Sequence, residues 1–446
     1  MAAQGSSPAG GGAVRRQRSV LTISAFALLL ATSLMAQKGG ARFKEEPAIV
    51  RAESAMDRQQ WTEAEGLLRK VVAADAKDAR AWFDLGYVMH AQKNYAEAIA
   101  AYRSAVAIQP ENFECNLNLG MMLAHEGNPD ASKYLERATH LKPTGAHPQE
   151  SLAHAWAALA ELEPATDAKS TRDKWSHAVT LAPGDPQYRL GFGAWLERAG
   201  DTAGAERECR KATELQPDSA DVWAALANLY MRGKHLPEAE GALRRLVTVA
   251  AQDESAHLQL GRVLSAEKKD DEATAELQKA LALKADDWEA LRELAFVEER
   301  DKQYAAAEEN YRALVAHFPD DADLHNGLGS VLMRQLKYAE AQAEFVRCVR
   351  LKPDWGEAYG QLAHAAAGNK EYELAIKALD ARKKLLPELP DSYFLRATCF
   401  DHLRQFAEAV ENYKAFLAVS KGQFPDDEWK ARHRLIAIEP EARKKK

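Results

Sequence analysis

The sequence contains few cysteines. Only four occur in 446 residues, namely Cys115, Cys209, Cys348 and Cys399. None forms a CxxC pair, and their wide spacing excludes a disulfide framework of the kind that holds small secreted domains together. We predict buried or partly buried free thiols, with a single disulfide bridge left open as the alternative.

The alternation of apolar and polar residues that is typical of β-strands is also missing. Val, Ile and Thr are scattered and Ala is abundant, which favours helices. The formal net charge is -7, and no part of the chain forms the strongly basic domain typical of nucleic-acid binders. We therefore predict an all-α protein that does not bind nucleic acid.

Catalytic motifs are absent as well. The sequence has no GxSxG, no HExxH, no P-loop and no GxGxxG after a strand. Its 13 histidines are dispersed without a partner at metal-ligand spacing on the same helix. We predict a protein that is not an enzyme and that needs no cofactor or metal.

An uncharged apolar run from Ser19 to Ala36 follows arginines at positions 15, 16 and 18. A positive flank, an apolar core and small residues at its end are typical of a secretory signal peptide. The run is also just long enough to span a bilayer, so an uncleaved anchor stays open. In both cases the positive flank stays inside, and we predict an exported chain, periplasmic or extracellular, that contacts the membrane only through this segment.

The rest of the chain repeats itself every 34 residues. The same step separates seven consecutive alanines: Ala205, Ala239, Ala273, Ala307, Ala341, Ala375 and Ala409. Multiples of 34 also separate Pro217, Pro319, Pro353 and Pro387. Such a period is the mark of a repeat architecture.

One period, residues 79–112, predicts a pair of helices. Trp82, Leu85 and Gly86 share a face of the first helix. The second helix carries apolar or small residues at i, i+3, i+4 and i+7 spacing, from Tyr95 to Val106. Pro110 ends it, since proline lacks the N–H that a helix interior needs.

These residues resemble the tetratricopeptide repeat, whose pattern is W-x2-L-G-x2-Y followed by Ala, Phe, Ala and Pro at fixed offsets. The match runs through Trp82/Leu85/Gly86, Asn116/Leu119/Gly120, Trp156/Leu159/Ala160, Trp223/Leu226/Ala227, His257/Leu260/Gly261, Leu291/Leu294/Ala295, His325/Leu328/Gly329 and Tyr359/Leu362/Ala363. The resemblance implies an all-α, right-handed superhelical solenoid of about eleven helical hairpins. Their predicted first residues are 45, 79, 113, 153, 186, 220, 254, 288, 322, 356 and 390.

The repeats divide the chain into predicted regions. Residues 1–36 hold the start and the signal or anchor, residues 45–180 the N-terminal hairpins, and residues 186–420 the regular ones. An insertion around residues 144–149 distorts the fourth hairpin. Residues 425–446 form a capping helix and basic tail, with an apolar stripe at Trp429, His433, Leu435, Ile436 and Ile438.

The family resemblance also implies a concave groove, lined by positions 2, 5, 9, 12 and 13 of each hairpin. Positions are counted from the predicted first residue of the hairpin, which is position 1. Position 13 holds Arg198, Arg232, Arg300 and Arg334, position 9 holds Asn228 and Arg262, and position 5 holds Arg292 and Asn326. These residues predict a basic strip that binds carboxylates or phosphates. The alternative is that arginines at a helix end only satisfy its carbonyls and dipole, with Glu197 and Glu299 beside two of them.

A second predicted surface lies at positions 5 and 9 of the second and third hairpins, where Phe83, Tyr87, Leu117 and Met121 occur. Such an apolar groove would bind an amphipathic helix or an extended peptide. A packing role stays open for the same residues.

We therefore predict a scaffold that binds protein or peptide partners in its groove. Two alternatives remain: an accessory protein that binds or exports polysaccharide, and a regulatory subunit of an enzyme complex.

Overall fold

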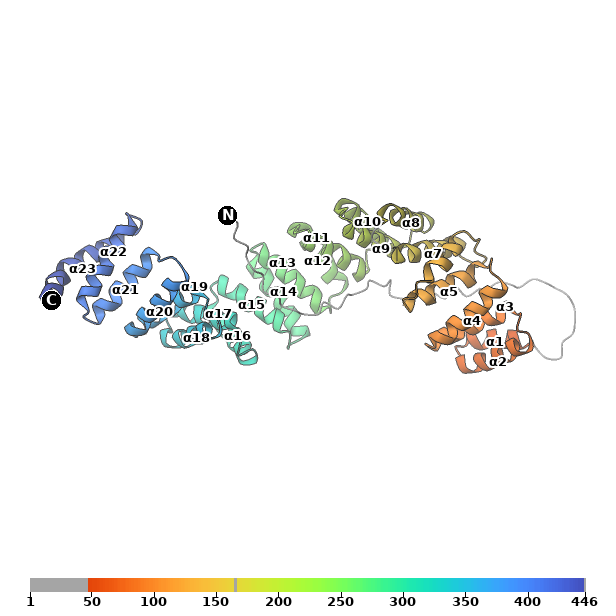
Figure 1. The fold of residues 1–446 in the computed structure, drawn as a ribbon, viewed down its shortest axis with the longest axis horizontal. Helices are drawn as coiled ribbons and strands as arrows, with labels where there is room; N and C mark the ends of the chain where they lie inside the picture. Colours follow the sequence, from red (N-terminus) through yellow and green to blue (C-terminus); the bar gives the residue numbers. More distant parts are fainter. Residues whose placement is uncertain (1–46, 164–166, 445–446) are drawn as a thin grey trace. The chain divides into compact units, whose positions relative to one another are not determined.

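A computed structural model describes residues 47–163 and 167–444 (Figure 1). The predicted signal or anchor, residues 19–36, lies outside these ranges. Among the described residues, no helix combines the length and the apolar character that crossing a membrane requires. Cys115, Cys209, Cys348 and Cys399 are buried thiols that form no disulfide within the described ranges, which confirms that prediction.

The described residues form 23 helices and no strand, which confirms the all-α prediction. The first eleven are α1 (Ala48–Asp57), α2 (Trp61–Ala74), α3 (Ala79–Ala91), α4 (Tyr95–Ile108), α5 (Phe113–His125), α6 (Ala131–Thr139), α7 (Pro148–Leu162), α8 (Ala168–Leu181), α9 (Pro186–Arg198), α10 (Thr202–Leu215) and α11 (Ala220–Arg232). The others are α12 (Leu236–Val249), α13 (Glu254–Ala266), α14 (Asp270–Leu283), α15 (Trp288–Arg300), α16 (Tyr304–His317), α17 (Ala322–Arg334), α18 (Tyr338–Leu351), α19 (Gly356–Gly368), α20 (Tyr372–Leu385), α21 (Pro390–His402), α22 (Phe406–Ser420) and α23 (Pro425–Lys444).

The helices from α1 to α22 follow one another as eleven pairs, and nine of the first helices begin at the predicted residue. The fourth pair differs, because α7 begins at Pro148 and not at residue 153. Proline fits the first turn of a helix, where its missing N–H is not needed. The insertion therefore extends the start of this helix. The preceding helix α6 is short, with nine residues.

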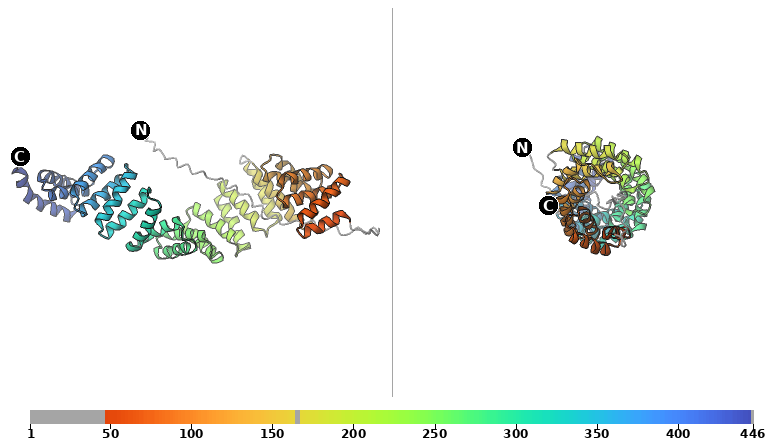
Figure 2. Two further views of the ribbon diagram at one scale, coloured as in Figure 1. Left: turned by 90° about the horizontal axis from the view of Figure 1, so that it is seen from below. Right: turned by 90° about the vertical axis from the view of Figure 1, so that its right-hand side faces the viewer.

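The chain forms two compact units that divide between Leu229 and Tyr230, within α11. The predicted division near residues 180–186 concerned the regularity of the hairpins and stays a prediction; α8 packs on α9 there. In each unit, successive hairpins stack side by side (Figures 1 and 2).

Small residues let the two helices of a hairpin approach closely. At position 8, a Cβ on Gly86 would lie 2.7 Å from the Tyr102 ring, and one on Gly329 would lie 2.8 Å from the Phe345 ring. Both rings come from position 24 of the same hairpin and are buried. A large residue at position 24 therefore requires a very small one at position 8.

A side chain at position 4 joins each of several hairpins to the loop before it. Its N–H group lies within hydrogen-bond distance of the carbonyl oxygen six residues earlier. The pairs are Trp82–Ala76 (3.0 Å), Asn116–Pro110 (2.8 Å), Arg189–Pro183 (3.0 Å), Trp223–Pro217 (2.7 Å), His257–Ala251 (3.3 Å) and His325–Pro319 (2.9 Å). These bonds satisfy carbonyls that the ends of the preceding helices leave without a partner.

In every hairpin except the fourth, the turn places one residue in the left-handed region, at position 15. The residue is glycine in two hairpins, Gly127 and Gly200, and lysine in several others. In the ninth hairpin it is Leu336, with φ 61° and a side chain that is 68% exposed. A leucine in this conformation is strained, and its side chain gains little burial in return.

We expect Leu336→Gly to raise the free energy of unfolding by about 0.5–1 kcal/mol, because relief of strain exceeds the extra entropy of an unfolded glycine. Chemical denaturation measures the difference. Ala343→Gly, at an exposed position inside α18, is the matched control and should lower stability by about 1 kcal/mol. Loss of stability in both variants would contradict the strain at Leu336.

Candidate functional site

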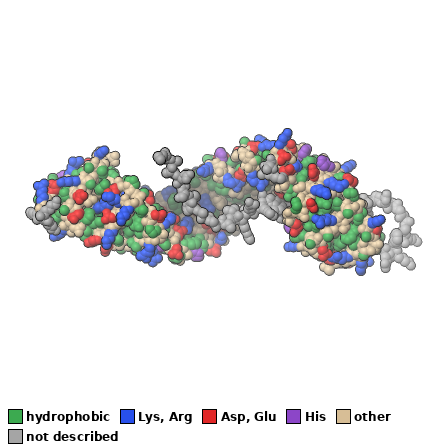
Figure 3. Space-filling view, viewed as in Figure 1, with side chains coloured by type: hydrophobic (Ala, Val, Ile, Leu, Met, Phe, Trp, Pro, Cys, Tyr) green, Lys and Arg blue, Asp and Glu red, His purple; other side chains and the backbone are tan. Residues whose placement is uncertain are grey.

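The first helices of the second unit present a wall of side chains at positions 5, 9 and 13. We call this set the first-helix wall, and it consists of Arg262, Arg292, Phe296, Arg300, Asn326, Ser330 and Arg334. Figure 3 shows that basic and acidic side chains are interspersed over the face of the molecule in view. The charges on the wall therefore have to be judged pair by pair.

Two arginines of the wall bind acidic residues of the next hairpin. Arg262 lies 3.2 Å from a carboxylate oxygen of Glu289 and 3.2 Å from one of Glu293, both on α15. Arg292 lies 2.8 Å from Asp321, which also accepts backbone N–H groups at the start of α17. Burial alone would raise the pKa of Asp321, but these bonds hold it below its ordinary value. Both guanidinium groups are thus neutralised inside the protein.

Arg300 binds residues of the preceding hairpin and not of the next one. It forms an ion pair with Asp270 at the start of α14 and donates to the backbone oxygen of Ser265 at 2.9 Å. Its guanidinium also lies over the ring of Phe296, 5.3 Å from the centroid. The sequence had suggested neutralisation by Glu299, but that carboxylate accepts a hydrogen bond from Tyr311 at 3.0 Å.

Two further arginines of the predicted strip differ from these three. Arg334 in the second unit and Arg198 in the first are exposed, and neither forms an ion pair within residues 47–163 and 167–444. Arg232 and Asn228 are exposed on α11, at the division between the units. Asn326 is half-buried on α17. Ligand binding by all of these residues stays a prediction.

The apolar surface of the first unit is partly used in packing. Phe83 lies 5.6 Å from the Tyr102 ring, and Tyr87 lies 6.1 Å from the Trp61 ring, between centroids. Both Phe83 and Tyr87 are partly buried and keep some exposed surface.

Leu117 is only 5% exposed and packs with Phe113, Ala155 and Leu159, so it belongs to the core and does not line a groove. Met121 borders the same cluster. The packing alternative therefore holds for Leu117, since α7 covers it, whereas Phe83 and Tyr87 keep open surface.

Asp84 lies next to this apolar surface on α3. Its Oδ2 atom is buried and accepts no hydrogen bond within the described part of the chain. Burial, and to a smaller extent the carboxylate of Glu53, raises the pKa of Asp84 to about 7. No sequence pattern pointed to this carboxylate, because Asp84 occupies an ordinary helical position.

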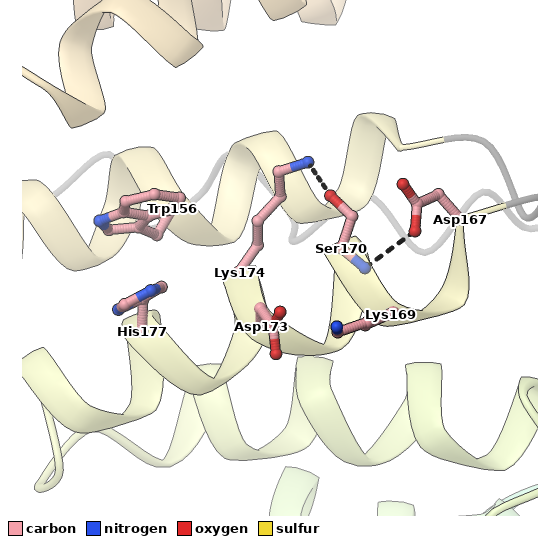
Figure 4. Close-up of a pocket in the computed structure, with 7 residues that line it drawn as sticks. All are labelled: Trp156, Asp167, Lys169, Ser170, Asp173, Lys174 and His177. Carbon is pink, nitrogen blue, oxygen red and sulfur yellow. Dashed lines mark hydrogen bonds between the residues drawn. The ribbon is translucent and has the colours of Figure 1, made fainter.

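A solvent-open hollow of about 360 Å³ lies on α7 and α8 and was not predicted. Figure 4 shows Trp156 next to His177, with Lys174 extending toward Ser170. The rings of Trp156 and His177 stack at 4.6 Å, and Lys174 lies 2.8 Å from the Ser170 hydroxyl. One feature of the sequence could have indicated this hollow: Trp156 occupies position 4 of the irregular hairpin. Among the described residues, its indole N–H donates to no loop carbonyl, unlike that of Trp82 or Trp223.

Metal binding finds no support in the described ranges. They contain no group of three or more His, Cys, Asp or Glu side chains arranged to hold an ion.

Asp84→Asn should stabilise the protein more at pH 8 than at pH 4. Because the pKa of Asp84 is raised from 3.8, the folded state binds its proton more tightly, and stability falls as pH rises from about 4 to about 7. We expect the gain from asparagine to be about 1–3 kcal/mol larger at pH 8. Denaturation curves at both pH values measure it, with exposed Asp130→Asn as the control. An equal gain at both values would contradict the raised pKa.

Comparison with known proteins agrees with the fold. Models described as tetratricopeptide repeat match residues 49–113, 196–260, 254–287, 297–354 and 326–390. Together these matches cover more than half of the chain.

Individual relatives are distant. Human protein O-mannosyl-transferase TMTC3 is 21% identical over 344 residues, which cover 74% of this chain and 34% of that protein. Cellulose synthase operon protein C of Xanthomonas axonopodis pv. citri (strain 306) is 28% identical over 195 residues, 43% of this chain and 11% of that protein. The chain thus spans about a third or less of these curated relatives. The crystal structure of YrrB, a TPR protein with an unusual peptide-binding site, is 20% identical, with a TM-score of 0.39, and covers 41% of this chain and 95% of that chain.

The 34-residue period, the close helix pairs and the family matches lead to one conclusion. The chain belongs to the tetratricopeptide repeat family.

Proposed function

We propose that the protein is an exported, non-enzymatic scaffold that binds a peptide or protein partner on the first-helix wall. One observation carries the proposal: Phe296 is 51% exposed in the middle of this wall, with Arg300 over its ring. An exposed aromatic side chain held by a neighbouring cation is already ordered, so it loses little entropy when a partner covers it. Such residues are frequent centres of binding energy.

The ion pairs determine which arginines of the wall can bind a carboxylate of a partner. Arg262, Arg292 and Arg300 have acidic partners, so a ligand would have to displace those partners before binding these groups. Arg334 requires no displacement within the described structure. We therefore infer a partner segment that places an apolar side chain on Phe296 and a carboxylate near Arg334.

The proposal of export rests on the sequence alone. The apolar run from Ser19 to Ala36 after three arginines supports it. A periplasmic or extracellular partner follows from the same proposal.

Phe296→Ala and Arg334→Glu should each reduce recovery of the native partner. We expect about tenfold weaker binding for each, equivalent to ~1.4 kcal/mol, because one removes apolar contact area and the other reverses a charge. Quantitative pull-down from the native source, followed by mass spectrometry, measures recovery.

Arg347→Glu is the matched control for the charge reversal. Arg347 is exposed on the second helix α18, away from positions 5, 9 and 13, and should leave recovery unchanged. Unchanged recovery with both wall variants would remove the basis for this binding surface.

A second candidate function, polysaccharide binding, is favoured by the hollow on α7 and α8. An aromatic face beside charged groups, here Trp156 with Lys169 and Asp173, suits the apolar face and hydroxyls of a sugar ring. The likeness to cellulose synthase operon protein C is consistent with this candidate.

Titration with soluble cello-oligosaccharides should quench tryptophan fluorescence if the hollow binds sugar, and Trp156→Ala should abolish the change. Trp288 is a matched control, because it stacks on His317 at 4.0 Å in a regular hairpin. Trp288→Ala should therefore leave the sugar-dependent change in place. A titration without any change in fluorescence would contradict sugar binding in the hollow. It would not bear on the proposed peptide site.

A further inference from the structure

The last described helix, α23, has two different faces. Leu435 and Ile438 are buried against α22, together with Ala431. The opposite face carries Trp429, which is 61% exposed, and Ile436, which is 75% exposed. The predicted single apolar stripe is therefore split between a buried face and an open one.

The open face is a continuous row along the helix. It consists of Asp426, Trp429, His433, Ile436, Pro440 and Arg443, all of them exposed. Their spacing alternates between three and four residues, which is the spacing of a seam between two packed helices. A helix that only shields the end of a repeat array would present a polar outer face.

The order of residues in this row is self-complementary. If two such helices lie antiparallel, Asp426 faces the partner's Arg443, and the same pair recurs at the other end. Trp429 then faces the partner's Pro440, and His433 faces the partner's Ile436. Each symmetric contact thus joins opposite charges at the ends and apolar or aromatic groups between them.

The groups in the row are available for such contacts. Asp426 and Arg443 form no ion pair with each other or with other described side chains. The Trp429 and His433 rings are 3.9 Å apart between centroids, so they already form one ordered surface. We propose that this row is a docking surface for a second copy of the chain, which binds through antiparallel pairing of α23 with α23.

The contact should be weak. The helix from Asp426 to Arg443 spans about 25 Å, and a seam between two such helices falls in the size class of transient interfaces. We expect a monomer–dimer equilibrium with a dissociation constant of about 10–100 μM. It is independent of the peptide site, because the first-helix wall lies on other helices.

Sedimentation equilibrium of the full chain tests the proposal, at concentrations from about 1 μM to about 0.5 mM. The mass should rise toward that of a dimer, and Trp429→Ala with Ile436→Ser should hold it at the monomer. Leu336→Ser replaces an equally exposed apolar residue in a turn and should leave the equilibrium unchanged. A wild-type chain that stays monomeric at all concentrations would overturn the proposal.

A charge swap tests the antiparallel geometry. Asp426→Arg alone should weaken dimerisation by about tenfold, because it places two cations together at each end. The double variant Asp426→Arg/Arg443→Asp should restore it. Dimerisation that stays weak in the double variant would show that these residues do not face each other. Circular dichroism confirms that each variant is folded.

Discussion

The close approach of the two helices within each hairpin is the constraint on which the rest of the structure depends. In the second and ninth hairpins, Gly86 against Tyr102 and Gly329 against Phe345 leave no room for a methyl group at position 8, and several other hairpins have alanine there. This contact fixes which side of the first helix is buried. Positions 5, 9 and 13 then fall together on the remaining surface, so the same packing rule that builds the fold also creates the wall that can bind a partner.

Much of this could be predicted from the sequence, because the packing rule repeats along the chain. The 34-residue period together with the family pattern predicted nine helix starts, and the scattered cysteines were correctly expected in the core. The state of the wall arginines could not be predicted in the same way. Arg262, Arg292 and Arg300 bind carboxylates about thirty residues away in a neighbouring hairpin, and a local pattern points only to adjacent residues such as Glu299.

The irregular places were the hardest to predict, and they hold the less usual features. The fourth hairpin departs from the period, and only the structure shows that Trp156 stacks on His177 beside an open hollow. On α23 the apolar residues were recognised, but their division into buried Ile438 and exposed Ile436 depends on how the helix rotates against α22. A sequence period predicts the regular hairpins, but it does not predict the structure of segments that depart from the period.

The central claim is that partners bind the first-helix wall and not the second helices. Site-specific photo-crosslinking in the native cells tests this most directly, with p-benzoylphenylalanine in place of Phe296 or of Arg347. The aromatic probe resembles phenylalanine and should preserve the contact. The account predicts a discrete crosslinked partner from position 296 and none from position 347. Equal crosslinking from both positions, or crosslinking from position 347 alone, would contradict it.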